Sequence, residues 1–97
     1  MLASCTGRLS AQLEHQWLLQ DPDADRTERS RATMIDLLDL VTDPDTAHEA
    51  LHIRIVAKEA QSRLLMRAMF NGDRDDAAWA RKRAEAQVSA CAGLLLS

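Results

Sequence analysis

The chain has 97 residues, a net charge of −3 and only three aromatic side chains, two Trp and one Phe. This length fits one domain, and a composition dominated by Ala, Leu and Arg offers little to a β-sheet. No uninterrupted apolar stretch is long enough to cross a membrane, so no membrane association is expected. We therefore expect one all-α domain over residues 1–97. It has two short helices in residues 1–43, then a long antiparallel helical hairpin in residues 44–97, and no cofactor is expected.

The charges are distributed unevenly along the chain. Residues 1–53 carry four basic and ten acidic side chains, whereas residues 54–83 carry eight basic and four acidic ones. This asymmetry is consistent with internal charge pairing, with self-assembly, or with a basic surface for an anionic partner. The simpler interpretation is that these are solvated helix faces.

The two cysteines, Cys5 and Cys91, do not suggest a disulfide framework. Two thiols in a helical chain of this size fit a reducing cytoplasm, where each behaves as a small buried hydrophobic side chain. The segment Leu2-Ala3-Ser4-Cys5 resembles a bacterial lipobox, but only Met1 precedes it, so Cys5 would be a lipidation site only with a start upstream. We expect a cytoplasmic protein with free thiols.

The first two helices are expected over about 3–20 and within 22–42. In the first helix, Gly7 is expected to weaken the opening turns. Its apolar residues recur every three or four positions and indicate one packed side: Leu2, Cys5 or Thr6, Leu9, Leu13 and Trp17. The tripeptides Asp21-Pro22-Asp23 and Asp43-Pro44-Asp45 mark two helix starts, because Asp caps exposed N–H groups and Pro fits the first helical position.

The hairpin is predicted to have arms at about 44–70 and 74–96, joined at Asn71-Gly72-Asp73. Gly72 should end the first arm in a left-handed conformation, and Asp73 should cap the second. The first arm has one apolar face at Ala50, Ile53, Val56, Ala57, Ala60, Leu64 and Ala68. The second arm has a stripe of mostly small residues at Ala77, Ala80, Ala84, Val88, Cys91 and Leu95. Such stripes predict close packing of the two arms, so that a bulky residue at Ala60 or Ala84 would overpack the seam.

A second apolar face of the first arm has no partner in the second arm. It must be covered by the two N-terminal helices or by another subunit. Together with the terminal leucines, this face predicts a homo-oligomer or a protein partner, and hence a non-enzymatic assembly or adaptor protein. The predicted interface residues are Leu51, Ile55, Leu65, Met66, Met69, Leu94 and Leu96.

Basic residues gather toward the predicted hairpin tip. They suggest an alternative function, a nucleic-acid-associated regulator that binds weakly and in a salt-dependent manner. Nearby carboxylates at Asp73, Asp75 and Asp76 favour the simpler interpretation of a partly neutralised, solvated surface. The candidate nucleic-acid-binding residues are Arg63, Arg67, Arg74, Arg81, Lys82 and Arg83.

The segment His48-Glu49-Ala50-Leu51-His52 fits the H-E-x-x-H pattern of zincin metallopeptidases. That resemblance implies a small zinc hydrolase in which His48 and His52 bind the metal and Glu49 is the general base. The longer metzincin pattern has Gly and His where this chain has Ile55 and Lys58. A third ligand would have to be Glu59, Glu85 or His15. Solvated histidines are the alternative interpretation.

The long hairpin after a short helical N-terminus resembles the oligomerisation core of small terminase subunits. The resemblance covers about 44–96 and is architectural, without a diagnostic motif. It implies a ring that regulates DNA packaging by the large terminase motor of a tailed phage or a gene transfer agent. The helix-turn-helix domain common in that family is not identifiable in residues 1–43.

Overall fold

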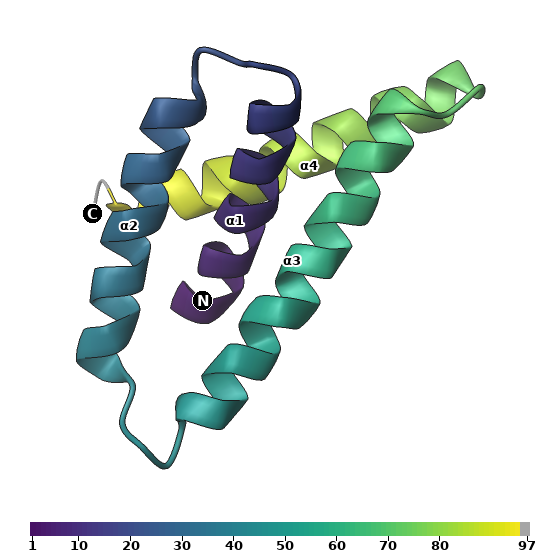
Figure 1. Cartoon of the computed structure of the whole chain (residues 1–97). Helices are drawn as coiled ribbons and strands as arrows, with labels where there is room; N and C mark the ends of the chain where they lie inside the picture. The colour runs from purple at the N-terminus through teal and green to yellow at the C-terminus, as the bar shows by residue number, and fades with distance from the viewer. Residues whose placement is uncertain (96–97) are drawn as a thin grey trace.

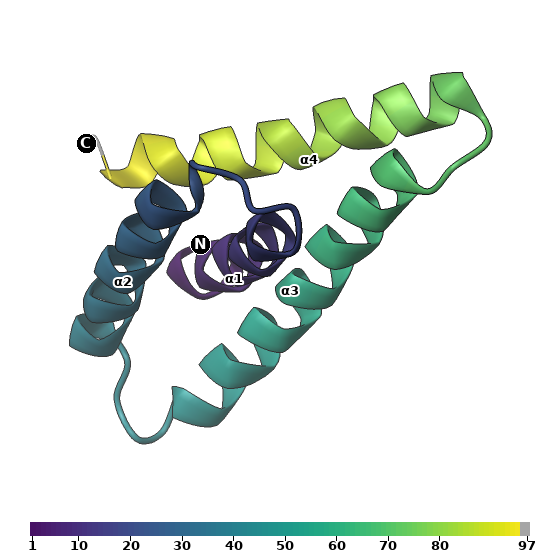
Figure 2. The ribbon, with the colours of Figure 1, turned by 45° about the horizontal axis from the view of Figure 1, so that its top comes forward.

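The first of four helices lies at the centre of the other three. A computed structural model describes residues 1–95 and places α1 at Leu2–Leu18, α2 at Ala24–Val41, α3 at Ala47–Met69 and α4 at Arg74–Leu95. In Figure 2, helices α2, α3 and α4 follow one another as the sides of a triangle with α1 between them, and in Figure 1 α4 crosses behind α1. The predicted all-α fold of four helices is confirmed, although α1 and α2, with 17 and 18 residues, are not short. Within the described range, no helix has both the length and the apolar character of a membrane span.

Helix α1 packs on three neighbours, so the prediction of a single packed side is wrong. Small side chains next to the apolar stripe allow other helices to approach α1 closely. A Cβ atom added at Gly7 would lie 2.1 Å from the carbonyl oxygen of Arg54 in α3. Gly7 therefore lies at a close crossing of α1 and α3, inside a helix that is unbroken from Leu2 to Leu18. The buried residues of α1 are Ala3, Cys5, Thr6, Gly7, Leu9, Ser10, Ala11, Leu13 and Gln16.

A disulfide joins Cys5 of α1 to Cys91 of α4, with 5.5 Å between the Cα atoms. Both cysteines are buried beside Leu9 and Met34. The prediction of two free thiols is wrong, because the triangle brings together helix positions that lie 86 residues apart in the sequence. Since its sulfur is in a disulfide, Cys5 also does not present the free thiol that lipidation requires.

The two Asp-Pro-Asp segments precede helix starts, as predicted, but the helices begin two to three residues after each Pro. In each segment the first Asp accepts a hydrogen bond through Oδ1 from the backbone N–H two residues later, at 2.8 Å for Asp21 and 3.0 Å for Asp43. These short turns hold the chain while it reverses direction.

The turn between α3 and α4 is built by side chains rather than by a left-handed glycine. Gly72 does not have a positive φ, so that prediction is wrong. The Asn71 side-chain oxygen accepts a hydrogen bond from the Asp73 N–H at 3.0 Å. The Asp73 Oδ1 in turn accepts hydrogen bonds from the Asp75 and Asp76 N–H groups at 3.0 and 3.2 Å, which confirms Asp73 as the cap of α4.

The two arms of the hairpin pack near the turn and then diverge (Figure 2). At the packed end, the buried Gln61 side chain donates a hydrogen bond to the Ala84 carbonyl oxygen at 3.1 Å, and Ala84 packs with Leu65 and with Ala11 of α1. Farther along, Val88, Cys91 and Leu95 of α4 pack around the Cys5, Leu9 and Met34 cluster instead of on α3. The small-residue stripe of α4 is therefore its packed face, as predicted, but α1 occupies the space that α3 was expected to fill.

This divergence makes Ala60 and Ala84 behave differently. Ala84 is buried, whereas Ala60 is exposed. We expect Ala84→Leu to lower the free energy of unfolding by about 1–3 kcal/mol, because the extra atoms have no space, and Ala60→Leu to leave it nearly unchanged. Urea denaturation of both variants checks this. Equal losses for the two variants would contradict the divergent packing.

Candidate interaction surface

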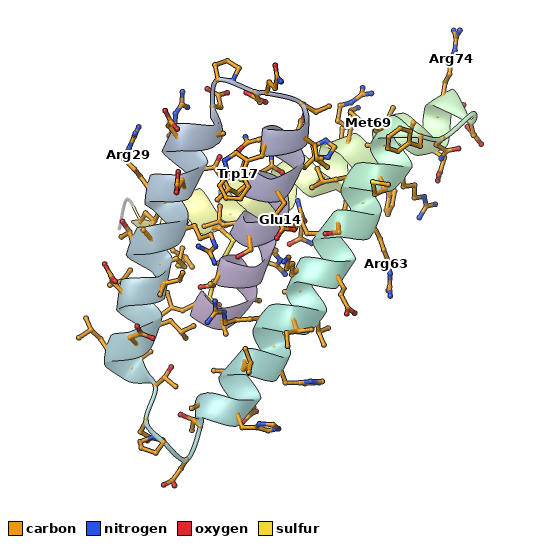
Figure 3. The ribbon with its side chains drawn as sticks, in the orientation of Figure 1. Glu14, Trp17, Arg29, Arg63, Met69 and Arg74 are labelled. Carbon is orange, nitrogen blue, oxygen red and sulfur yellow. A yellow bond between two sulfur atoms is a disulfide. The ribbon has the colours of Figure 1, made fainter. Side chains whose placement is uncertain are left out.

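Apolar side chains of α1 and α3 are exposed around two adjoining cavities. We call these side chains the front surface and define it as Trp17, Leu18, Leu51, Ile55 and Met66. All five are between 48 and 81% exposed. Trp17, Leu51 and Ile55 line one of these cavities, Leu18 and Met66 line the other, and Glu14 lines both. In Figure 3, Glu14 and Trp17 of α1 lie between α2 and α3 on the side facing the viewer.

The front surface is open because α2 and α3, both fully described, do not contact each other. Each packs on α1, which leaves a groove with α1 as its floor and the two other helices as its walls. The cavity in this groove has a volume of about 280 Å³. Apolar residues supply much of its lining, in particular Leu13, Trp17, Leu51 and Ile55. This shape can accept a side chain or a helix edge from a partner.

The groove also contains three cations and one carboxylate. Arg31 of α2 donates a hydrogen bond through Nε to the Ser10 hydroxyl at 2.7 Å, and Lys58 of α3 pairs with Glu14 at 2.7 Å. Arg54 of α3 also lines the cavity. Neither Arg31 nor Arg54 has an ion-pair partner among residues 1–95. The groove therefore has an excess of positive charge in a chain whose net charge is negative.

The structure separates the predicted interface residues into several groups. Leu51, Ile55 and Met66 belong to the front surface, but Leu65 is only 9% exposed and packs in the core. Leu65 is therefore not available to a partner, because α1 and α4 cover it. Met69 lines a separate cavity beside the end of α1, and Leu94 packs on the disulfide cluster. Leu96 lies outside the described residues.

Two front-surface residues were not predicted. Trp17 was assigned to the buried stripe of the first helix, and Leu18 was not considered for the interface. The sequence offers one signal for them. Trp17 and Leu18 are adjacent near the end of a helix, so their side chains point in different directions, and the apolar stripe of that helix requires only one of the two. Their exposure of 54 and 81% shows that the last turn of α1 extends beyond the packed centre.

The six candidate nucleic-acid-binding residues do not form one face. Successive helical positions point about 100° apart, so Arg81, Lys82 and Arg83 project in three directions. Arg81 lines a cavity beside α1 that also contains Asp21 and Glu85. The labelled Arg63 and Arg74 point away from each other in Figure 3.

The remaining candidate, Arg67, is engaged within the hairpin. Its guanidinium forms two hydrogen bonds to the Asp76 carboxylate, at 2.6 and 2.5 Å, and lies 5.2 Å from the centre of the Trp79 ring. Asn71 also donates a hydrogen bond to this carboxylate. The hydrogen bond from Arg67 lowers the pKa of Asp76 below its ordinary value, with burial opposing this, and the same bond raises the pKa of Arg67. The charge of Arg67 is therefore paired with Asp76 at the turn.

The candidate zinc ligands His48 and His52 are exposed on the first turns of α3. Within residues 1–95, no group of three His, Cys, Asp or Glu side chains is arranged to hold a metal ion. The third ligands considered from the sequence, Glu59, Glu85 and His15, thus do not join the pair.

Comparisons with known proteins identify no relative of this chain. The chain matches no protein-family model, no curated protein and no solved structure.

Proposed function

We propose that the chain is a non-enzymatic helical assembly protein that associates with copies of itself through the front surface. One observation carries the proposal. Only five large apolar side chains are buried in the described residues: Leu9, Leu13, Met34, Leu38 and Leu65. By contrast, fifteen are exposed: Met1, Trp17, Leu18, Leu19, Leu37, Leu40, Val41, Leu51, Ile53, Ile55, Val56, Met66, Met69, Phe70 and Trp79.

This ratio is unusual for a domain that works alone. Single exposed hydrophobic residues are common on monomers, but large contiguous patches mark sites of association. The other buried hydrophobic residues among residues 1–95 are Ala and Cys, which bury little apolar area each. Association would cover the front surface and supply the burial that the single chain lacks.

Two neighbouring residues of α3 provide a matched test. Ile55 and Val56 are 48 and 51% exposed, but only Ile55 lies on the front surface. We expect Ile55→Gln to weaken self-association about tenfold or more and Val56→Gln to change it less than about twofold, because half-exposed apolar residues matter mainly where a partner covers them. Sedimentation velocity over a range of protein concentrations measures both. Equal effects for the two variants would contradict the assignment of the front surface.

A narrower form of the proposal is a small-terminase-like subunit that assists DNA packaging. Its support is the helical architecture and the exposed cations Arg63, Lys82 and Arg83, which are free of ion pairs within the described residues. A DNA mobility-shift assay at two salt concentrations tests it, because binding through phosphates weakens steeply with salt. Absence of a shift at the lower salt would leave the assembly proposal intact and remove the DNA-packaging one.

The cellular compartment in which the chain folds is also part of the proposal. The prediction of a cytoplasmic protein depended on two free thiols, and Cys5 and Cys91 form a disulfide instead. Because disulfides persist mainly in oxidising compartments, the bond favours a chain that folds outside a reducing cytoplasm and counts against the DNA-packaging form of the proposal.

A further inference from the structure

The end of α2 and the start of α3 form a strongly acidic corner of the molecule. We define the acidic corner as residues 36–49, which contain five carboxylates and no Lys or Arg: Asp36, Asp39, Asp43, Asp45 and Glu49. All five are exposed, and none forms an ion pair within residues 1–95. The corner also exposes three large apolar side chains, Leu37, Leu40 and Val41, at 36, 82 and 69%.

The corner and the groove are complementary in both charge and apolar character. The groove carries Arg31 and Arg54 without ion-pair partners, next to Trp17, Leu51 and Ile55. The corner offers carboxylates without partners next to exposed aliphatic side chains. Within one chain, no ion pair among residues 1–95 joins a carboxylate of the corner to a cation of the groove.

We infer that the acidic corner of one copy enters the basic groove of another. In this contact Arg31 and Arg54 receive the carboxylates of the corner, and the aliphatic residues of the corner cover the front surface. Complementary potentials of this kind select the partner and fix the register of docking. The inference rests on the proposed self-association and specifies which two surfaces meet.

Charge reversal followed by mixing tests the contact. The groove variant is Arg54→Glu, and the corner variant is the double substitution Asp39→Arg and Asp45→Arg. Asp39 and Asp45 suit the test because their carboxylates accept no hydrogen bond in the described residues, whereas Asp43 holds its own turn. Each variant alone is expected to weaken self-association at least about tenfold, since each places like charges together. An equimolar mixture is expected to recover association to within about threefold of wild type, because every contact then joins opposite charges.

Matched controls distinguish loss of the corner-to-groove contact from a general effect of charge on association. Arg29→Glu makes the same change as the groove variant, and the double substitution Asp25→Arg and Glu28→Arg makes the same change of charge as the corner variant, at exposed positions of α2 outside the groove and the corner; we expect neither to change association. Circular dichroism melts verify that each variant folds. If Arg54→Glu does not fold, Arg54→Gln replaces it and is expected to weaken association in the same direction, by a smaller factor.

The outcomes distinguish this contact from the broader proposal. A monomeric wild type would contradict self-association itself. An oligomeric wild type whose mass is unaffected by the reversals, or a mixture that fails to recover association, would overturn only the corner-to-groove contact. Evidence that the groove binds only a small anion would also overturn the corner-to-groove contact. In that case inorganic phosphate would raise the melting temperature of wild type but not of Arg54→Gln, while neither reversal changed the mass.

Discussion

Replacing Cys91 with Ala should lower the free energy of unfolding by about 4–5 kcal/mol. The disulfide closes a loop between residues 86 positions apart, and the entropy that such a loop removes from the unfolded chain corresponds to this amount. In a domain of this size the melting temperature should fall by roughly 20 °C. A calorimetric or circular dichroism melt at fixed protein concentration measures the shift.

Reduction of the wild-type chain supplies the control without changing a side chain. Dithiothreitol should lower the melting temperature of the wild type by a similar amount and should leave that of Cys91→Ala unchanged. Alkylation of freshly purified, unreduced protein in denaturant should add no mass at Cys5 or Cys91. Two alkylated cysteines, together with a melting temperature insensitive to dithiothreitol, would contradict the disulfide.

Among the glycines in the described part of the chain, Gly7 is the one whose substitution by Ala should destabilise the protein most. The new Cβ would lie 2.1 Å from the Arg54 carbonyl oxygen and 2.9 Å from the Lys58 nitrogen. Both are backbone atoms of α3, so relief requires α1 and α3 to move apart along their whole contact. We expect a loss of about 3 kcal/mol in the free energy of unfolding, measured by urea denaturation.

Gly93→Ala is the matched control, because Gly93 is also helical and an added Cβ there meets no atom within 4 Å. In that position the methyl group should be neutral or should stabilise by up to about 1 kcal/mol, since Ala favours a helix over Gly. Opposite signs for the two substitutions are the expected result. A neutral Gly7→Ala would mean that α1 and α3 do not cross as closely as the structure shows.

The sequence predicted the elements of this fold better than their arrangement. Helical periodicity and the Asp-containing turns located four helices, because those signals are local. The position of α1 inside the triangle depends on small residues such as Gly7 and Ala11, whose role is visible only once a partner helix is placed beside them. The pairing of Cys5 with Cys91 depends on that same arrangement, and no local sequence pattern predicts it.

The candidate surface was predicted in part for the same reason. The 3.6-residue period placed Leu51, Ile55 and Met66 together on α3, and the structure leaves all three exposed on the front surface. Leu65 followed the same period, but α1 and α4 cover it. The basic groove was not predicted, because Arg31 comes from α2 whereas Arg54 and Lys58 come from α3, and the two helices face each other only across α1.

The molar mass of the wild-type chain in solution tests the central claim most directly. Size-exclusion chromatography with multi-angle light scattering, at several concentrations and near-physiological ionic strength, measures it without a label or a partner. Self-association through the front surface predicts a mass that is a multiple of 10.8 kDa and that falls toward 10.8 kDa on dilution or with Ile55→Gln. A mass of 10.8 kDa at every concentration would contradict it.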